Sequence, residues 1–283
     1  MRIQYRYACI AALAAAATGG LGTTPASAAL YDQSVVPGVI FGSGNANGEF
    51  TVDRHNDVEL GLRGKLRFGT NNLPQNTFNS NGDGTYSFSA GTPDLLGPNL
   101  PGWASPTTPI WSFEWSINTN YDNLGSFVLG DLTYEMGLDF DPTAGTMFQT
   151  FDPINILAPG YGDHSIGDNS TDETTDHVAG NSTDYGNLLT TYIVAQNSWT
   201  YEFYNEFFPF NGFDPNQDGT YTIYLAAFDG ANELARTSID IIVGTGTPSE
   251  VPIPGAALLF ASGLGALGFA GRKKAKKAAE KAA

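Results

Sequence analysis

Cysteine is almost absent from this chain. The single cysteine, Cys9, lies near the N-terminus, in a segment that we expect to be removed. The remaining chain then has no disulfide framework, no thiol nucleophile and no cysteine-based zinc site. Its stability must come from a packed core or from bound ions.

Positive charge is scarce as well. No Lys or Arg occurs between Arg67 and Arg236, and residues 29–250 hold five basic against 28 acidic side chains, a net charge of −23 where the whole chain has −16. Such a surface repels nucleic acid and anionic lipid, so we expect no nucleic-acid partner. It suits divalent cations and neutral polysaccharide, although acidity also keeps an extracellular protein soluble.

The common signatures of catalysis are missing too. The chain has no G-x-S-x-G elbow, no P-loop, no dinucleotide fingerprint and no Glu-x-Asp-x-x-Glu strand of the laminarinase-like kind. Glu135, Asp139 and Asp141 lie close in sequence. On one strand, however, Glu135 and Asp139 are about 13 Å apart, whereas glycosidase carboxylates are roughly 5–10 Å apart. We therefore expect that the chain is not an enzyme.

The N-terminus has the three parts of a secretory signal peptide. Arg2 and Arg6 form a positive n-region, residues 8–17 form an apolar h-region, and residues 26–28 (Ala-Ser-Ala) match the small-residue cleavage site. We predict that residues 1–28 are a signal peptide, which places the body outside the cytoplasm. An uncleaved anchor is the alternative interpretation.

The C-terminus carries a proline motif, an apolar run and a basic cluster. The motif is Val251, Pro252, Ile253 and Pro254, and the uncharged run 255–271 follows it. A helix over this run is about 25 Å long at ~1.5 Å per residue, slightly short of a hydrocarbon core of about 30 Å. The basic cluster within residues 272–283 keeps this end cytoplasmic, and its side chains can snorkel to the interface. It is made of Arg272, Lys273, Lys274, Lys276 and Lys277. A plain membrane anchor is the alternative, but an anchor does not require the prolines.

Together these features resemble the PEP-CTERM sorting domain, in the variant built on a Val-Pro-Leu-Pro-Ala core. Ile253 stands for the usual Leu, Gly255 for the usual Ala, and no Pro-Glu-Pro triplet is present. The resemblance covers residues 251–283. It implies a Gram-negative exopolysaccharide producer, an exosortase-type processing enzyme as partner, and passage through the inner membrane before release to the cell surface or matrix. The body is similar to other exported proteins of that group, which brings no catalytic residues.

Between the ends, residues 29–244 are expected to form one acidic body and residues 245–250 a linker. The chain is 41% hydrophobic and 12% aromatic, which favours a packed core over a disordered stalk. Asn, Asp, Gly, Ser and Thr crowd the segments between apolar runs, as they do in the turns of all-β domains. We predict an all-β fold, an antiparallel two-sheet sandwich of the jelly-roll or immunoglobulin-like kind.

Alternation of apolar and polar residues locates the strands. It is clearest over residues 111–117 and 132–140, which we expect to pair like a hairpin. Residues 58–68 are typical of a strand with a bulge after Gly64. Further strands are expected at 86–88, 192–195, 220–228 and 234–243, the last two joined by a hairpin turn. The best place for a short helix is residues 187–195.

One loop resembles the opening of a calcium site. Asp214, Asn216 and Asp218 alternate and are followed by glycine, so that short oxygen ligands could point inward around a sharp turn. Position twelve of an EF-hand would be Leu225, so a full Ca²⁺ site needs a carboxylate from elsewhere. Residues 79–84 are a poorer copy. The alternative for both loops is an Asx-turn before a strand.

Aromatic side chains are the candidates for sugar binding. Trp103 and Trp199 sit in polar, loop-like stretches and are free to stack on sugar rings, whereas Trp111 and Trp115 alternate with polar residues as core side chains do.

The acidic stretch 163–184 contains His164 and His177. They are too far apart in sequence for a short helical metal pair. A zinc site and a solvated loop are the two interpretations.

Three functions remain open. The leading one is a non-enzymatic cell-surface or extracellular-matrix protein, associated with exopolysaccharide or biofilm and sorted by its tail. The second is a carbohydrate-binding module on the same fold with a structural calcium ion. The third and least favoured is a secreted glycan hydrolase.

Overall fold

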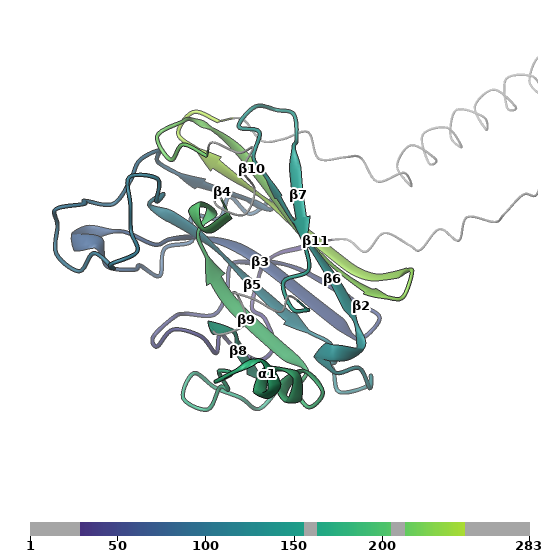
Figure 1. The fold of residues 1–283 in the computed structure, drawn as a ribbon. Coiled ribbons are helices and arrows are strands. Elements are labelled where there is room, and N and C mark those ends of the chain that lie inside the picture. Colours follow the sequence, from purple (N-terminus) through teal and green to yellow (C-terminus); the bar gives the residue numbers. More distant parts are fainter. Residues whose placement is uncertain (1–28, 156–162, 205–212, 247–283) are drawn as a thin grey trace, which may run out of the picture. The chain divides into compact units, whose positions relative to one another are not determined.

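The computed structural model describes residues 29–155, 163–204 and 213–246, drawn in colour in Figure 1. All of them belong to one compact unit, Ser27–Ile253. The predicted signal peptide 1–28 and sorting tail 251–283 lie outside the described residues. Within the described part, no helix is long and apolar enough to cross a bilayer.

The first sheet has six strands, and every neighbouring pair in it is antiparallel. In spatial order the strands are β1 (Leu30–Gln33), β2 (Phe50–His55), β3 (Val58–Leu66), β5 (Trp111–Asn118), β9 (Val194–Trp199) and β8 (Ser165–Gly167).

The second sheet has five strands and is mixed. In spatial order they are β4 (Thr85–Phe88), β11 (Asn232–Val243), β10 (Gly219–Asp229), β6 (Thr133–Asp139) and β7 (Phe148–Phe151). β4 runs parallel to β11, so the prediction of wholly antiparallel sheets is wrong at this pair. The two strands are far apart in sequence, and no short turn fixes their relative direction.

The two sheets share one hydrophobic core, as predicted. Trp111, Phe113 and Trp115 of β5 are fully buried in it, and the strand lies where the alternation predicts it. Aromatic contacts cross between the sheets: the rings of Trp111 and Tyr221, on β10, are 6.0 Å apart. The polar residues of β5 are buried as well, so this strand is covered on both faces.

Only one of the two predicted strand pairings is correct. β10 and β11 form a hairpin with Asp229 opposite Asn232, as predicted. The expected hairpin of residues 111–117 with 132–140 is wrong, because β5 pairs with β3 and β9 whereas β6 pairs with β10 and β7. The chain crosses between the sheets there, and alternation alone carries no information about which strands meet.

The predicted bulge in β3 is also wrong. β3 and β5 keep one register from Glu59 opposite Asn118 to Leu66 opposite Trp111. Gly64 serves the packing of the sheets instead, since a Cβ there would lie 2.7 Å from Phe88 and 2.9 Å from Ile241. Glycine in a strand interior can mark such a close approach as well as a bulge.

The helix lies earlier than predicted. α1 (Ser182–Leu189) begins after Asn181, whose side chain accepts hydrogen bonds from the backbone N–H of Thr183 and Asp184. This is a typical N-cap with an acidic residue in the first turn. Residues 194–199, part of which we expected in the helix, form β9.

Candidate functional site

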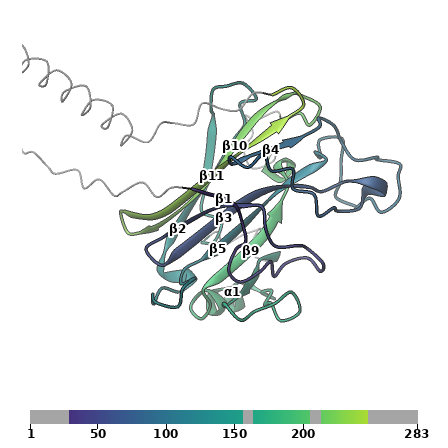
Figure 2. The same cartoon turned by 180° about the vertical axis from the view of Figure 1, so that it is seen from behind.

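The outer face of the six-stranded sheet is covered by the N-terminal segment of the body. Residues 35–47 lie in front of β3, β5 and β9 in Figure 2, where they are drawn in purple. Val35, Val39 and Phe41 form a small second core with Phe50 and Val52 of β2. The six-stranded sheet therefore has apolar contacts on both of its faces.

Hydrogen bonds from buried polar side chains hold the same segment. The backbone N–H of Ile40 donates to Gln196 Oε1 at 2.8 Å, and that of Val36 donates to Glu59 Oε1 at 2.7 Å. Asn118 Nδ2 donates to the carbonyl of Val36 at 2.6 Å. The segment is thus bonded to β3, β5 and β9 although it forms no strand there.

Arg63, Lys65 and Glu114 form a buried ion network under this segment. Arg63 is the partner of Glu114 in the β3–β5 register, and its Nη2 lies 2.5 Å from Glu114 Oε2. Lys65 Nζ lies 3.1 Å from Glu114 Oε1. Asn45 completes the network: its Nδ2 donates to Glu114 Oε1 at 3.0 Å and its Oδ1 accepts from Lys65 Nζ at 2.5 Å. One carboxylate is shared between two cations.

The Arg63 guanidinium is enclosed on both faces. Its Cζ lies 4.1 Å from the centroid of the Phe50 ring and 3.7 Å from that of Phe78. Its Nη1 donates to the carbonyl of Gly48 at 2.6 Å. Burial lowers the pKa of Arg63, and the neighbouring Glu114 opposes this shift. Because its donors are taken up by these partners, Arg63 serves as a structural cation.

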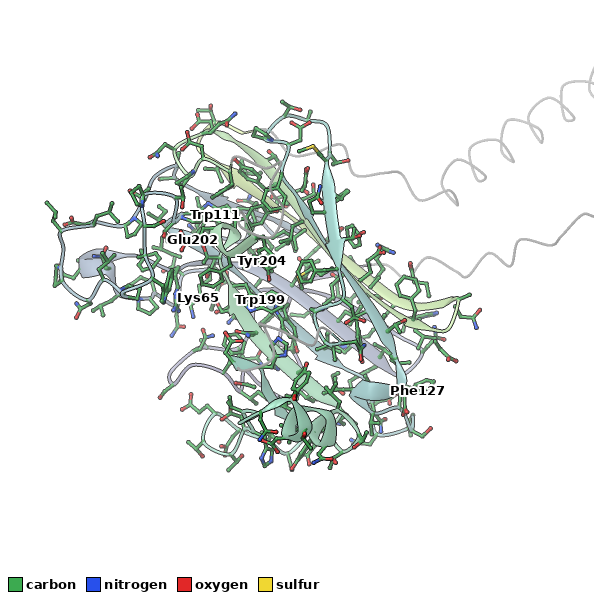
Figure 3. The ribbon with its side chains drawn as sticks, in the orientation of Figure 1. Lys65, Trp111, Phe127, Trp199, Glu202 and Tyr204 are labelled. Carbon is green, nitrogen blue, oxygen red and sulfur yellow. The ribbon has the colours of Figure 1, made fainter. Side chains whose placement is uncertain are left out.

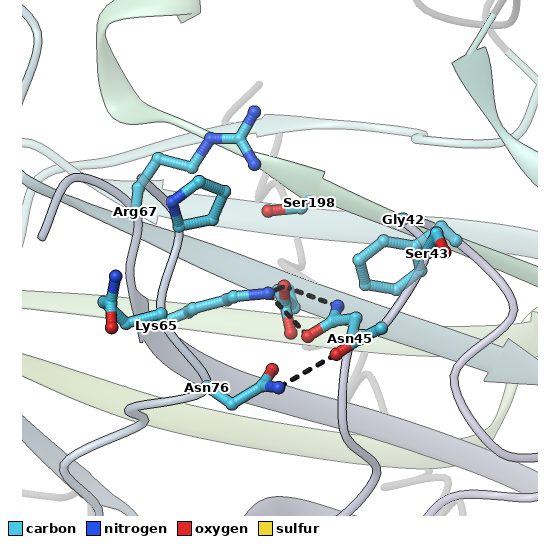
Figure 4. A pocket seen from close by; sticks show the side chains of 12 residues that line it. Gly42, Ser43, Asn45, Lys65, Arg67, Asn76 and Ser198 are labelled. Carbon is cyan, nitrogen blue, oxygen red and sulfur yellow. Dashed lines mark hydrogen bonds and ion pairs between the residues drawn. The ribbon is translucent and has the colours of Figure 1, made fainter. Parts of the chain in front are cut away.

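A pocket of about 160 Å³ opens beside this network (Figure 4). Lys65, Glu114 and Ser198 contribute to it from β3, β5 and β9. The turn at residues 41–45 and the loop at residues 74–76 supply its other lining residues, together with Arg67. The pocket therefore stands on strands and is bordered by two loops.

Hydrogen bonds fix these two loops to each other. The backbone N–H of Asn45 donates to the carbonyl of Gly42 at 3.1 Å, and the turn needs positive φ at Gly42 (67°) and Gly44 (77°). Asn76 bridges the loops: its Nδ2 donates to the carbonyl of Gly44 at 2.9 Å, and its Oδ1 accepts from the N–H of Ala46 at 3.1 Å. The opening of the pocket is thus held by side-chain amides.

Arg67 is the pocket cation to which the described residues offer no partner. Within residues 29–155, 163–204 and 213–246, no acceptor is within hydrogen-bonding or ion-pair distance of its side chain, and Figure 4 draws none. Burial lowers the pKa of Arg67, and Glu114 again opposes the shift. A guanidinium stays charged in proteins, so the donors of this partly exposed side chain are available to solvent or to a ligand in the pocket.

The local charge at the pocket contrasts with that of the body. Lys65 and Arg67 line the pocket with one carboxylate, Glu114, and Arg63 lies beside them; these are three of the five basic residues within 29–250. A second carboxylate, Glu173, lies at the rim and accepts from the N–H of Gly44 at 2.8 Å. The residues that line the pocket therefore carry a net positive charge in a body with a net charge of −23. A pocket of this kind attracts anions locally.

The side chains of Asp214 and Asp218, two of the predicted calcium residues, accept hydrogen bonds from other residues of the chain. Asp214 Oδ1 accepts from the backbone N–H of Asn216 at 2.9 Å, which is an Asx-turn. Asp218 Oδ2 accepts from Thr245 Oγ1 at 2.6 Å and from the Thr245 N–H at 3.1 Å. No group of three or more His, Cys, Asp or Glu side chains gathers like metal ligands in the part of the chain that is described. Calcium binding stays a prediction, for titration with Ca²⁺ to test.

The two predicted sugar-binding tryptophans lie in different surroundings. Trp103 is 42% exposed and makes edge contacts with Phe68 and Phe203. Trp199, labelled in Figure 3, is the last residue of β9 and only 6% exposed, contrary to the loop position we expected. It packs against core aromatics such as Trp115, at 5.0 Å. Of the two, Trp103 alone can reach a sugar without rearrangement.

The loop that carries Trp103 is tied to the residues after β9. Glu202, also labelled in Figure 3, accepts hydrogen bonds from the hydroxyls of Thr108 and Ser105. Burial raises the pKa of Glu202, and these two bonds oppose the shift. The position of Trp103 is therefore supported by its own loop and by the segment at 201–204.

The histidines and acids considered for zinc or hydrolysis serve separate structural bonds. His164 Nδ1 lies 3.0 Å from the Tyr185 hydroxyl, whereas His177 Nε2 lies 2.7 Å from the Tyr192 hydroxyl. Burial lowers the pKa of His164 to about 4, so this ring is neutral. Glu135 accepts from a different tyrosine on the other sheet. The structure gives these groups no shared site.

The pocket residues were missed at the sequence level, although a signal existed. Glu59, Arg63 and Lys65 fall among the apolar residues of β3 with a spacing of two or four, which puts them on one face. Glu114 occupies the corresponding outer face of β5. Charged residues inside an otherwise buried strand indicate an ion network, and this pattern is readable from sequence.

Comparison with known protein families, with curated proteins and with solved structures finds no match.

Proposed function

We propose that this chain is an exported, non-enzymatic cell-surface or matrix protein whose body binds extracellular polysaccharide. The observation that carries the binding role is the pocket beside Arg63, Lys65 and Glu114, which is open, polar and built on strands. Export and sorting rest on the sequences of residues 1–28 and 251–283.

The chemistry of the pocket supports binding rather than hydrolysis. Glu114 is the only carboxylate among the lining residues that the structure describes, and two cations and Asn45 already engage it. A glycosidase needs two carboxylates roughly 5–10 Å apart, one of them able to give up a proton. A secreted glycan hydrolase is therefore the weaker proposal.

The architecture supports the same role. For the fold we propose a sandwich of the jelly-roll or immunoglobulin-like kind, since two sheets enclose one core. A sandwich presents a rigid face and two sets of loops to a ligand.

For the route to the surface we propose processing by an exosortase-type enzyme after insertion of the tail in the inner membrane. The test compares the full-length chain with the double variant Pro252→Ala/Pro254→Ala in a host that encodes such an enzyme. We expect the parent to lose its tail and reach the surface or medium, and the variant to stay membrane-bound at full length. Ile253→Leu, which restores the usual core, is the matched control and should be processed. Equal processing of the parent and the double variant would rule out the proposed role of this motif.

A carbohydrate-binding module that uses Trp103 is the second candidate function, because Trp103 is exposed and held between two other rings. Cosedimentation with the host's polysaccharide tests it. We expect Trp103→Ala to abolish most of the binding and to lower the melting temperature only modestly, since the ring also makes edge contacts with Phe68 and Phe203. Unchanged cosedimentation of this variant would remove Trp103 from the site.

A further inference from the structure

The pocket offers more hydrogen-bond donors than its own residues accept. Lys65 has three N–H donors, of which Asn45 Oδ1 and Glu114 Oε1 take two. Arg67 has five, none of them engaged by the described residues. The arrangement therefore has room for a ligand that is an acceptor and carries negative charge.

We propose that this pocket binds the carboxylate of an acidic sugar, of the uronic acid class. The inference rests on the proposed polysaccharide-binding function and names the ligand class for it. The guanidinium fork of Arg67 matches a carboxylate with two parallel hydrogen bonds, and Lys65 supplies a third donor from β3. Glu114 holds the Lys65 ammonium group in place, and the third N–H donor of Lys65 is left for the ligand.

The neutral lining suits the rest of a sugar. The side-chain amides of Asn45 and Asn76 and the hydroxyl of Ser198 can bond ring hydroxyls, and Phe41 and Pro74 offer apolar surface. At about 160 Å³ the pocket is smaller than the roughly 300–1,000 Å³ of sites for drug-sized ligands. It therefore takes one sugar unit of a polymer rather than a long stretch of it.

The acidity of the body does not oppose this binding strongly. Charges separated by more than about 8 Å are largely screened at physiological salt. The lining carboxylate, Glu114, is already paired with Arg63 and Lys65, and that of Glu173 at the rim accepts from the N–H of Gly44 at 2.8 Å. Because Lys65 and Arg67 line the pocket with one carboxylate, Glu114, the lining has a net charge of +1 and balances a singly charged carboxylate rather than a phosphate dianion.

The test is calorimetric titration of the full-length chain, purified in detergent, with glucuronate, glucose and inorganic phosphate. We expect glucuronate to bind and glucose to bind at least about tenfold more weakly, because a charge-assisted hydrogen bond is lost with the carboxylate. Arg67→Gln should weaken glucuronate binding by about tenfold or more, and Arg67→Lys, which keeps the charge without the fork, by less. Binding should also weaken as salt is raised.

Arg236→Gln is the matched control, since it makes the same substitution and the same change of charge on β11, in the other sheet. It should leave glucuronate binding unchanged. The proposal is overturned if glucose binds as tightly as glucuronate or if phosphate binds more tightly than glucuronate. It is also overturned if Arg67→Gln and Arg236→Gln change glucuronate binding equally. Should glucuronate fail to bind while the chain still cosediments with the host polysaccharide, the pocket assignment fails and the proposed function stands.

Discussion

The outer faces of the two sheets carry the same motif in opposite surroundings. On β3, Arg63 pairs with Glu114 between two phenylalanine rings, and both charged side chains are fully buried. On β11, Arg236 pairs with Glu233 at 2.7 Å and lies 4.7 Å from the centroid of the Tyr224 ring, but these two charged side chains are 38% and 39% exposed. Segment 35–47 covers the first face together with the rings of Phe50 and Phe78, and this cover buries the pair.

The comparison shows how one motif serves two purposes. The exposed pair is solvated and screened, so it contributes little to stability and leaves its neighbours free to move. The buried pair must be satisfied completely, because an uncompensated charge in that place is costly. Its partners Asn45 and Lys65 are thereby fixed in position, and these are the residues that line the pocket. The buried network thus prepares a rigid site.

Removal of the buried carboxylate should have the largest effect. In Glu114→Ala, Arg63 and Lys65 lose their counter-ion while they stay buried, so we expect a loss of about 3–5 kcal/mol of unfolding free energy. Glu114→Gln keeps the shape and should still be strongly destabilised. Chemical denaturation measures both. A loss below about 1 kcal/mol would show that the covered face behaves like the open one.

Acid should destabilise the fold through the buried side chain of His164. Burial lowers the pKa of His164 to about 4, so the unfolded chain takes up a proton below about pH 6.5 that the folded chain refuses. This contribution to stability is complete above pH 6.5 and is lost as the pH falls towards 4, by up to about 3 kcal/mol. The measurement is denaturation of the parent and of His164→Phe across this range.

The variant is needed because carboxylates titrate in the same range. Burial raises the pKa of Glu59 and Asp139. The folded chain therefore binds protons at these two groups more readily than the unfolded chain, so their effect on stability is opposite to that of His164 and favours the fold as the pH falls. The difference between the parent and His164→Phe isolates the histidine. If both lose stability with the same slope, His164 is not buried as a neutral ring.

Two glycines of β3 allow the tightness of packing on the inner and outer faces of the sheet to be compared. A Cβ on Gly64 meets Phe88 and Ile241 of the other sheet, so Gly64→Ala should cost about 1–3 kcal/mol by overpacking. A Cβ on Gly61 lies 2.7 Å from Val35, in the covering segment. We expect Gly61→Ala to cost less, since that segment forms no strand with β3 and can shift. Equal losses would mean that the cover is as rigid as the second sheet.

The sequence predicted those parts of the fold that depend on neighbours in the chain. Alternation located β5, β6, β10 and β11, and the Asp229–Asn232 turn joined the last two correctly. Pairings between distant strands, such as β4 with β11, leave no local pattern, and the β5–β6 hairpin was wrong for that reason.

The candidate site was harder to predict because its cover resembles a loop. Segment 35–47 contains glycine, asparagine and serine, yet Gln196, Asn118 and Glu59 bond its backbone. Such bonds between residues far apart in sequence have no signature in composition. The charges within β3 were visible, but their burial depends on this cover. Likewise, the polar neighbours of Trp199 suggest a loop, and its burial follows only from the pairing of β9 with β5.

The smallest effect is expected on the open face. Glu233→Gln removes the partner of Arg236 where both side chains are more than a third exposed, so we expect the unfolding free energy to change by about 0–1 kcal/mol. The change should shrink further at high salt, because screening weakens exposed pairs first. Denaturation at low and high salt measures it beside Glu114→Gln, which has the same change of charge. A large, salt-independent loss in Glu233→Gln would show that the second face is covered too, by a segment or partner that shields it from water.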